Sequence, residues 1–541
     1  MTISSEYDFI IVGAGSAGSV LANRLSNHSK YRVLVLEAGR NDNSLWIQVP
    51  IGYGKIFHDS RFNWKYVTNP IPTMQNNPMY WPRGKVLGGS SSINAMVYVR
   101  GHPSDYNEWN DVAPGWGWKD VAPIFSRMED WNGKPDNIRG KFGPLSVEHI
   151  EGRSHPLTDR FIQAGVEMGY PYNSDYNGST MEGVSLYQIT TKNGFRHSAA
   201  KSYLKPAMKR NNLDVITNAH VTKINFHEKR AIGVEYIKNG ILKKVNSRND
   251  IILSSGAVNS PQLLQLSGIG NPEELQKLGI QIVSESLEVG RNLRDHLGLD
   301  HIYRTNIPTL NSTLRPILGK IKVALQYAIS RKGPLSLSLN QGGGFIKLDD
   351  KSNGPDLQLY CQPLSYTRAP VGSRPLMMPD PFDGFGLGFS PCKPTSVGYL
   401  TIGSSNPFVQ PEIHPNYLST DHDMNLMFAG SKLIREIANT DAFKSAIEEE
   451  VLPSLKVKNR HEIEDYIRKN AWTVFHPCGT CRMGIDPKKN VVNERLKVHG
   501  VENLRVADAS IFPNIPTGNT NAAAIMVGEK ASDIILEDRM N

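Results

Sequence analysis

The apolar positions near the start of the chain predict a buried strand, a helix and a second buried strand. Residues 9–12, FIIV, form a short continuous apolar run, which is typical of a parallel strand covered on both faces. Residues 19–26, SVLANRLS, place their apolar side chains at helical spacing. Residues 33–36, VLVL, repeat the buried-strand pattern and lead directly to Glu37. A strand, a helix and a second strand in this order indicate an α/β fold.

Three glycines, Gly13, Gly15 and Gly18, lie between the first strand and the helix at the spacing G-x-G-x-x-G. In a dinucleotide-binding fold the first permits a tight turn, the second lets a pyrophosphate approach the backbone, and the third lets helix and strand pack closely. Ser16 belongs to the same predicted site, because a helix N-terminus offers free N–H groups to phosphates. Glu37, 19 residues after Gly18, is placed to accept hydrogen bonds from the ribose of adenosine. The motif predicts dinucleotide binding and leaves FAD and NAD as alternatives.

Other segments predict strands, a helix and a long loop. Residues 356–364, DLQLYCQPL, and 397–404, VGYLTIGS, alternate apolar and polar positions, which favours an antiparallel sheet. In residues 254–270 the pattern predicts a strand, a turn and then a helix that begins at Pro261. Residues 367–384 are rich in proline and glycine without periodicity, which indicates a loop.

Composition and charge restrict the class of protein. The 541 residues suffice for roughly two to four domains, and 39% hydrophobic with 21% charged residues is ordinary for a soluble globular protein. The formal net charge is +8, but basic and acidic residues are interspersed, which argues against a nucleic-acid partner. No signal peptide and no run of 18 apolar residues is visible, so we expect a cytoplasmic protein without a transmembrane segment. Peripheral membrane contact stays open.

Residues 476–484, HPCGTCRMG, combine a histidine with two of the chain's four cysteines. The spacing of Cys478 and Cys481 allows a redox dithiol, half of a metal site, or neither. A redox C-x-x-C is expected at a helix N-terminus in a thioredoxin-like unit, and a zinc site needs about four ligands. No second Cys/His pair lies nearby in the sequence, so no metal site is predicted. Four cysteines in 541 residues also exclude a disulfide scaffold.

Further stretches, taken with the glycine motif and HPCGTCRMG, carry a family resemblance. They are RGKVLGGSSSINAMVYVRG at 83–101, SSGAVNSPQLLQLSGIG at 254–270, VGRNLRDH at 289–296 and a segment at 504–533 that begins LRVADAS. Together, from about residue 6 to residue 535, the chain resembles the glucose–methanol–choline (GMC) family of FAD-dependent alcohol oxidoreductases. RGHPSDYNEW at 100–109 is most similar to choline dehydrogenase-like bacterial enzymes.

The resemblance implies an α/β fold with a Rossmann-like FAD-binding domain of the GMC type and a substrate-binding domain built on an antiparallel sheet with helices. We expect the FAD-binding domain to be discontinuous, at residues 1–155, 210–305 and 465–541. The substrate-binding domain is expected at residues 156–209 and 306–464. The oligomeric state is not implied, and a homo-oligomer stays open.

The resemblance also implies which residues contact FAD. Asp508 is expected near the ribityl chain and the pyrophosphate together with Ala509, and the backbone of Val221 is expected at the adenine. Ile93 stands where some family members have a histidine that is linked covalently to the flavin, so we expect noncovalent FAD. The residues implied near the isoalloxazine ring are Gly88, Gly89, Ser90, Ser91 and Asn94.

In the family pattern H-P-x-G-T-x-x-M-G the histidine carries the chemistry. His476 is then the base that removes the hydroxyl proton while a hydride moves from the carbinol carbon to flavin N5. An imidazole, with an ordinary pKa near 6.5, suits that task at neutral pH. Asn519 matches the second polar group of the family's site. Cys478 and Cys481 are expected to be packing residues, and His296 is expected to be scaffold near the domain junction.

The substrate is less well specified. Choline-oxidising relatives have a glutamate shortly before a G-G-F sequence, where this chain has Gln341, and Phe475 stands where a tyrosine is usual. Because a quaternary ammonium needs aromatic faces and a carboxylate, choline is less favoured. We expect a primary alcohol that is oxidised to the aldehyde: a small neutral alcohol, or a hydroxy acid such as 3-hydroxypropionate, for which Arg368 or Arg374 offers a cation.

Several alternatives stay open at this point. Choline dehydrogenase and an alcohol oxidase that uses O₂ share every motif quoted. An NAD-dependent dehydrogenase and a noncatalytic flavin-binding protein are alternatives of a different class. The electron acceptor, whether a quinone, another carrier or O₂, is not specified by the sequence.

Overall fold

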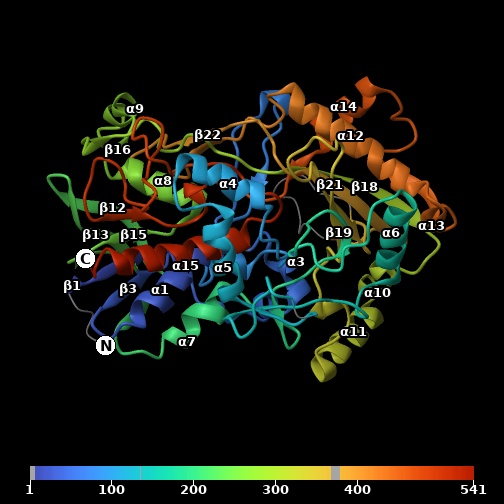
Figure 1. Ribbon diagram of the computed structural model, residues 1–541, viewed down its shortest axis with the longest axis horizontal. Coiled ribbons are helices and arrows are strands. Elements are labelled where there is room, and N and C mark those ends of the chain that lie inside the picture. The colour runs from blue at the N-terminus through green and yellow to red at the C-terminus, as the bar shows by residue number, and fades with distance from the viewer. Residues whose placement is uncertain (1–5, 135, 367–377, 541) are drawn as a thin grey trace.

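The computed structural model describes residues 6–134, 136–366 and 378–540. The molecule is elongated and has two lobes (Figure 1). The lobe at the left of Figure 1 contains a parallel sheet and both ends of the described chain, and the lobe at the right contains an antiparallel sheet. The expected fold class, a Rossmann-like parallel sheet combined with an antiparallel sheet and helices, is confirmed.

The two predicted N-terminal strands are confirmed near the middle of a five-stranded parallel sheet. β2 (Phe9–Val12) pairs with β3 (Val33–Leu36), and every residue of both strands is buried. A strand that is covered on both faces needs apolar residues at consecutive positions, which explains these two runs. The sheet order is β11 (Leu213–Ile216), β3, β2, β15 (Ile251–Leu253) and β26 (Leu504–Val506).

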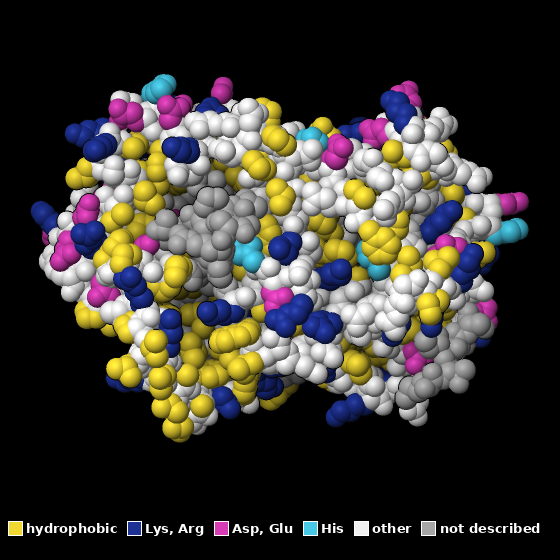
Figure 2. Space-filling model, turned by 180° about the vertical axis from the view of Figure 1, so that it is seen from behind, with side chains coloured by type: hydrophobic (Ala, Val, Ile, Leu, Met, Phe, Trp, Pro, Cys, Tyr) yellow, Lys and Arg dark blue, Asp and Glu magenta, His cyan; other side chains and the backbone are white. Residues whose placement is uncertain are grey.

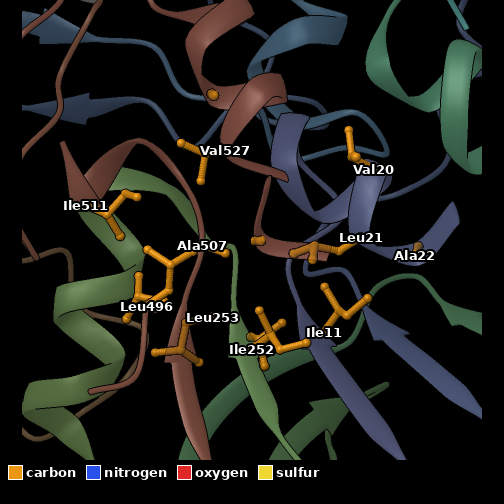
Figure 3. Packing of buried hydrophobic residues seen from close by; sticks show 14 of the residues in the cluster. Ile11, Val20, Leu21, Ala22, Ile252, Leu253, Leu496, Ala507, Ile511 and Val527 are labelled. Carbon is orange, nitrogen blue, oxygen red and sulfur yellow. The ribbon is translucent and has the colours of Figure 1, made fainter. Parts of the chain in front are cut away.

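Two helices from opposite ends of the chain pack side by side against this sheet. α1 (Ser16–Ser26) follows β2 directly, as predicted, and contacts α15 (Asn521–Glu537) along its length. A Cβ at Gly528 would lie 2.8 Å from the carbonyl oxygen of Ala17, so this close approach depends on the absence of a side chain. Figure 3 shows the packing of Val20 and Leu21 from α1 with Val527 from α15 above Ile11 and Ile252.

A four-stranded sheet completes the left lobe. Its order is β1 (Glu6–Tyr7), β14 (Ile241–Ser247), β13 (Arg230–Lys238) and β12 (His220–His227). β12 follows β11 after a short turn, in which the N–H of Ala219 donates to the carbonyl oxygen of Glu37 at 2.9 Å. The turn therefore brings Val221 close to the carboxyl end of β3.

The right lobe is organised by an antiparallel sheet. α6 (Pro156–Glu167) and α12 (Asp421–Ala438) pack against its strands. The short strand β25 (Trp472–Thr473) pairs with β18 (Leu297–Thr305) and leads into HPCGTCRMG. The sheet order is β24 (Ile447–Leu452), β18 (Leu297–Thr305), β21 (Gly384–Pro391), β20 (Leu357–Gln362), β19 (Gly342–Ile346) and β8 (Gly183–Leu186).

The predicted domain boundaries stay a prediction. The sheets show, however, where one strand near a boundary and the two alternating runs lie. Strand β18 at 297–305 pairs in the antiparallel sheet, although the predicted boundary puts it with the FAD-binding domain. Of the two alternating runs, 356–364 contributes β20 to this sheet. Residues 397–404 contain β22 (Tyr399–Thr401), which pairs instead with β23 (Glu412–His414) in a separate two-stranded sheet.

The predicted start of the helix in residues 254–270 is wrong. α8 (Gly256–Leu266) begins five residues before the expected Pro261, which lies inside the helix. Proline has no N–H, so in a helix it leaves the carbonyl oxygen four residues earlier without its usual donor. That oxygen belongs to Ala257, and the hydroxyl of Thr480 donates to it at 2.7 Å. A side chain from the HPCGTCRMG segment thus makes the proline tolerable.

The remaining elements are short or lie at the surface. No helix in the described part of the chain is long and apolar enough to cross a membrane. The other helices are α2 (Leu45–Gln48), α3 (Tyr53–Ile56), α4 (Pro103–Val112), α5 (Trp118–Met128), α7 (Lys205–Ala207), α9 (Pro272–Lys277), α10 (Leu310–Leu314), α11 (Ile317–Ser330), α13 (Asp441–Lys444) and α14 (Arg460–Asn470). Short strand pairs are β4 (Tyr66–Val67) with β5 (Tyr80–Trp81), β6 (Glu129–Trp131) with β7 (Leu145–Val147), β9 (Thr191–Lys192) with β10 (Phe195–Arg196), and β16 (Ile269–Gly270) with β17 (Ser284–Glu285).

Candidate active site

A cavity with an empty volume of about 1060 Å³ lies at the carboxyl ends of β2, β3 and β15. Open parallel sheets bind their ligands at this edge. The walls come from the glycine turn, the end of β3, the start of β12, the start of α8 and the residues after β26. The predicted cofactor residues that line it are Gly13, Gly15, Ser16, Glu37, Gly89, Ser90, Val221, Asp508 and Ala509.

Two glycine-rich segments touch each other at this cavity. Gly13 has a φ of +99°, and a Cβ at Gly18 would lie 2.0 Å from the carbonyl oxygen of Gly13. A Cβ at Gly89 would lie 2.7 Å from the Cα of Gly15. Side chains at these positions would push the turn, the helix and the second glycine segment apart. The spacing of the glycines therefore follows from backbone contact.

Glu37 occupies the wall at the end of β3. Its carboxyl oxygens accept hydrogen bonds from the N–H groups of Ala14 and Gly39, at 2.8 and 2.7 Å. Burial raises the pKa of Glu37 to about 7, although these two N–H groups and Lys85 act in the opposite direction. A carboxyl group held in this way can accept further hydrogen bonds from a diol such as a ribose.

Asp508 lies across the cavity, after β26. Its carboxylate accepts hydrogen bonds from the N–H groups of Gly256 and Ser510, both at 2.8 Å, and from the hydroxyl of Ser260 at 2.5 Å. These bonds tie the end of β26 to the start of α8. Asp508 therefore organises the cavity wall as well as lining it.

Four predicted cofactor residues do not line this cavity. Gly18 lies behind the turn, and Gly88 has a φ of +86°. The hydroxyl of Ser91 donates to the carbonyl oxygen of Gly88 and accepts from the N–H of Ala199. The amide oxygen of Asn94 accepts from Arg196 at 2.8 Å. In the structure these residues hold the second glycine segment in place, and any contact with cofactor stays a prediction.

The two predicted catalytic residues lie side by side. Nε2 of His476 is 3.1 Å from Nδ2 of Asn519. His476 follows β25, and Asn519 stands just before α15, so the pair joins two segments that are 43 positions apart. The N–H of His476 also donates to Asp295 at 2.7 Å, which fixes the backbone from which the imidazole extends.

His296, which we expected to be scaffold, is in contact with this pair. Its Nδ1 lies 2.9 Å from Nδ1 of His476, and its Nε2 lies 2.9 Å from the carbonyl oxygen of Cys392. A carbonyl oxygen can only accept, so Nε2 of His296 carries a proton. Burial lowers the pKa of His296 to about 4, so the ring is neutral at neutral pH and its Nδ1 can only accept. Nδ1 of His476 must therefore be the donor, which leaves the lone pair of His476 on Nε2.

The amide of Asn519 is oriented from the other side. Its oxygen accepts from Nε2 of Gln358 at 3.1 Å, so its Nδ2 faces His476. Gln358 donates also to the hydroxyl of Tyr187 at 3.0 Å, and that hydroxyl gives its own proton to the carbonyl oxygen of Leu359. At each end of this chain of hydrogen bonds, a backbone carbonyl oxygen can only accept. This fixes which group donates in every bond between the two ends. Both ends agree that Nε2 of His476 accepts and Nδ2 of Asn519 donates.

The electrostatics of the pair favour a neutral base. Burial, with smaller effects from His296 and Arg83, holds the pKa of His476 well below its ordinary value. Burial also raises the pKa of Asp295 to about 6, partly offset by the groups that donate to it. The imidazole is therefore unprotonated at neutral pH, as a proton acceptor must be.

The predicted substrate residues have different surroundings. The side-chain oxygen of Gln341 accepts from the N–H of His155 at 2.7 Å, at the start of α6, and in the described residues no hydrogen bond joins Gln341 to His476 or Asn519. Phe475 adjoins His476, and its ring lies 5.4 Å from that of Phe57. Arg368 and Arg374 lie outside the described residues.

The cysteines of HPCGTCRMG belong to the core of the left lobe. Cys478 and Cys481 are free and buried, and burial raises the pKa of both thiols. The N–H of Cys478 donates to the carbonyl oxygen of Arg294, and that of Cys481 to Ser510. No cluster of three or more metal-binding side chains occurs in the part of the chain that the structure describes. The packing interpretation of the two cysteines is consistent with these contacts.

The chain is similar over nearly its whole length to several known proteins. The curated alcohol dehydrogenase [acceptor] of Pseudomonas putida is 41% identical over 538 residues, which cover 98% of this chain and 96% of that protein. The mitochondrial choline dehydrogenase of Mus musculus is 40% identical and matches 99% of this chain and 91% of its own length. Among solved structures, pyridoxine 4-oxidase from Mesorbium loti is 31% identical, with a TM-score of 0.87 over 97% of this chain and 98% of that one.

Formate oxidase from Aspergillus oryzae RIB40 is 26% identical and superposes on all of this chain and all of its own with a TM-score of 0.92. The family of GMC oxidoreductases matches the chain over residues 7–298 with its N-terminal part and over residues 394–528 with its C-terminal part. These matches cover the glycine turn, the cavity, His476 and Asn519. The chain belongs to the GMC oxidoreductases, FAD-dependent enzymes that act on CH–OH donors.

Proposed function

We propose that this enzyme oxidises an uncharged primary alcohol to the aldehyde, with His476 as the base and Asn519 as the donor that holds the substrate oxygen. The positions of the protons in these hydrogen bonds support the proposal. Nε2 of His476 carries no proton and lies 3.1 Å from Nδ2 of Asn519, which donates. A hydroxyl group can donate its proton to the first and accept a hydrogen bond from the second. Neither a thiol nor a metal is needed for this step.

The cavity at the parallel sheet fits FAD, the cofactor that membership of the family implies. Gly13, Gly15 and Ser16 would hold the pyrophosphate at the N-terminus of α1, and Glu37 would hold the adenosine ribose. A Cβ at Gly15 would have no protein atom nearer than 3.7 Å, so the backbone there is open to a ligand. When bound, FAD supplies the acceptor for the hydride that leaves the carbinol carbon.

We infer that the cofactor is held noncovalently. Ile93, which stands at the position of the histidine that is linked to flavin in some family members, is buried. Its side chain packs in a small apolar cluster with Ile47, Ile56, Phe62 and Val86. An isoleucine offers no nucleophile for a covalent bond, so denaturation should release the flavin.

The residues of the chain prepare the hydroxyl group for hydride departure. Removal of the hydroxyl proton by Nε2 of His476 increases the electron density on the oxygen and lowers the barrier for the neighbouring C–H bond. The ring that results carries protons on both nitrogens, and Nδ1 keeps its bond to His296. The amide of Asn519 stabilises the negative charge that develops on the substrate oxygen. Burial of His476 strengthens both effects.

The groups bonded to the pair favour a substrate without positive charge. The side chains that share hydrogen bonds with Asn519, namely Gln358 and, beyond it, Tyr187 and Tyr360, are uncharged. The carboxylate of Asp295 is already bonded to the N–H of His476 and to two buried hydroxyl groups. A trimethylammonium group near a carboxylate gains about 4 kcal/mol at 4 Å and an effective dielectric of 20. Among the described residues no carboxylate bonds to the side chain of His476 or Asn519, so choline should lack this gain and bind poorly.

Anaerobic stopped-flow flavin reduction tests the choice of substrate. We expect linear and benzylic primary alcohols to give the highest second-order rate constants, above choline and 3-hydroxypropionate. If choline reduces the flavin fastest, the argument from the uncharged surroundings is wrong and the enzyme acts as a choline dehydrogenase. If 3-hydroxypropionate is fastest, a cation serves the site, and Arg368→Ala and Arg374→Ala would identify it.

Two simple observations test the class of enzyme. Acid precipitation of the yellow protein should release FAD into the supernatant, and flavin in the pellet would contradict noncovalent binding. A colourless protein that oxidises alcohols only with NAD would contradict the whole proposal. Mixing the alcohol-reduced enzyme with air-saturated buffer separates dehydrogenase from oxidase, and we expect reoxidation to be slower than flavin reduction by the best alcohol.

A further inference from the structure

Helix α11, residues 317–330, presents an apolar surface to solvent. Val323 and Tyr327 are its only buried residues, and they hold it to the right lobe. Figure 2 shows apolar side chains gathered at the lower left, where α11 of Figure 1 lies when the molecule is seen from behind. Exposed apolar groups of this extent mark an interaction surface. The large side chains are Ile317, Leu318, Ile321, Leu325 and Ile329, between 49% and 85% exposed.

These side chains form a single stripe along the helix. With successive residues turned by about 100°, the five of them and the two exposed alanines of the helix fall within a sector of roughly 140°. Lys320 adjoins one edge of this stripe and Lys322 the other. The buried Val323 and Tyr327 are on the opposite side. The helix therefore rests on the protein with one side and points its apolar stripe directly away.

The charged side chains of the segment that carries the stripe have one sign. Residues 301–348 contain no aspartate or glutamate. Two basic residues of this segment away from α11 form ion pairs, Arg304 with Glu449 and Lys347 with Glu182. The basic residues on α11 or beside its ends, Arg315, Lys320, Lys322, Arg331 and Lys332, form no ion pair with a carboxylate within the described residues.

We propose that α11 is a membrane-surface anchor that lies in the plane of an anionic bilayer. A helix with a wide apolar stripe between lysines buries that stripe at the boundary of headgroups and acyl chains, while the lysine heads reach the phosphates. A second copy of this chain fits the surface less well, because a two-fold contact would bring the same unpaired cations face to face. Anionic lipid supplies the opposite charge and the apolar phase together.

Vesicle sedimentation of the holoenzyme tests the proposal. We expect binding to vesicles of phosphatidylcholine with phosphatidylglycerol, and weaker binding to phosphatidylcholine alone. Leu318→Ser with Leu325→Ser should lower the partition coefficient about tenfold for each leucine, since burial of such a side chain corresponds to at least that factor. Ile241→Ser with Leu242→Ser, on the similarly exposed β14, is the matched control and should bind like the parent protein.

The charge reversal Lys320→Glu with Lys322→Glu should remove the preference for the anionic vesicles, with a loss of at least about tenfold. Absence of binding by the parent protein, or an equal loss in the β14 control, would overturn the anchor. Equal binding to both kinds of vesicle would overturn the role of the lysines. A dimer in light scattering that dissociates on Leu318→Ser with Leu325→Ser, without vesicle binding, would assign the stripe to self-association instead.

A fluorescent label can place the helix in the lipid. The four native cysteines are buried, so Leu325→Cys provides a selective attachment site for an environment-sensitive dye. We expect its emission to shift to the blue with anionic vesicles and to be quenched by spin-labelled acyl chains. A label at Leu242→Cys should show neither change. A label at position 325 that stays unquenched would contradict insertion.

Discussion

The cofactor cavity and the catalytic pair are built in different ways. Five glycines line the cavity, and its first wall comes from one stretch of the chain that begins at Val12 and ends at Ala38. The catalytic pair is oriented by side chains from segments far apart, with Tyr187, His296 and Gln358 acting on His476 and Asn519. A site of the first kind follows from local spacing. A site of the second kind exists only after the two lobes have come together.

Replacement of a glycine at the cavity should remove the cofactor itself, and with it all activity. In Gly18→Ala the new Cβ would lie 2.0 Å from the carbonyl oxygen of Gly13, so the turn and α1 must separate. We expect the purified variant to contain less than about a tenth of the normal flavin, because the backbone donors for the pyrophosphate are displaced. The ratio of flavin to protein absorbance measures this.

Gly152→Ala is the matched control for that change. Gly152 has a φ of +72°, but no heavy atom lies within 4 Å of the position that its Cβ would take. The variant should keep its flavin, at a cost of about 1 kcal/mol of backbone strain. If both variants lost flavin equally, contact between backbones would not be the reason for the glycine spacing.

Loss of the base should affect the other region alone. His476→Ala should slow flavin reduction by at least about 100-fold, the lower scale of general base catalysis. His476 does not line the cavity, so the flavin content should stay normal. Anaerobic reduction and the absorbance ratio, measured on one preparation, separate the two effects. Reduction that is unchanged would remove His476 from the mechanism.

The contrast explains how much could be predicted from the sequence. The strands at 9–12 and 33–36, the helix between them and Glu37 were predictable, because each depends on neighbouring residues. The role of His296 was not, because its ring meets that of His476 across 180 positions of the chain. Its place in NLRDH carried the family resemblance but no sign of this contact.

Tertiary contacts also explain the smaller differences. The start of α8 before Pro261 depends on the hydroxyl of Thr480, which no local pattern reveals. Gln341 stands at the position of a glutamate in choline-oxidising relatives, whereas its side chain bonds to the backbone at the start of α6. Features that depend on neighbouring residues are therefore predictable from the sequence, whereas contacts between distant side chains are not.

Changing His296 sharpens the comparison, because this residue acts through His476. In His296→Leu the proton on Nδ1 of His476 loses its acceptor, which frees the other tautomer and costs about 1 kcal/mol. We expect flavin reduction to slow about tenfold with normal flavin content. His296→Asn retains an acceptor near the position of Nδ1 and should recover most of the rate.

The pH profile distinguishes a positioning role from a merely structural one. His296→Leu removes a neighbour that helps to lower the pKa of His476, so the acid limb of kcat/KM should move to higher pH. His296→Asn removes the same charge, so its limb should also move to higher pH, while its rate recovers. Equal rates in the two variants would exclude the donation from Nδ1 of His476 to His296.

Two buried groups, one in each lobe, should also respond oppositely to pH in the FAD-free protein. Burial raises the folded pKa of Glu37 to about 7, so its protonated form contributes stability that is lost as the pH rises from about 4.5 to 7. Burial lowers the folded pKa of His301, in β18, to about 3, so its neutral form contributes stability that is lost as the pH falls below about 6.5. Each effect is roughly 2 kcal/mol between pH 5 and 7.

Calorimetric melting of the FAD-free variants measures these slopes. Relative to the parent protein, Glu37→Gln should raise the melting temperature more at pH 7 than at pH 5. His301→Gln should raise the melting temperature more at pH 5 than at pH 7. A change in melting temperature that is the same at both pH values does not affect this comparison. Slopes of the same sign in both variants would contradict the opposite pKa shifts of Glu37 and His301.

The smallest effect on flavin reduction is expected for the two cysteines of HPCGTCRMG, although their spacing also occurs in redox dithiols. Cys478→Ser with Cys481→Ser should leave flavin reduction within about twofold, because a buried thiol whose pKa is raised is a poor nucleophile. The segment is held by backbone, through the bonds of Cys478 with Arg294 and of Cys481 with Ser510, and serine keeps both. Burial of two hydroxyl groups should cost about 1–3 kcal/mol each, seen as a lower melting temperature. If the double variant lost reduction while His476→Ala kept it, the pair would be a redox dithiol, and the catalytic region would depend on local spacing after all.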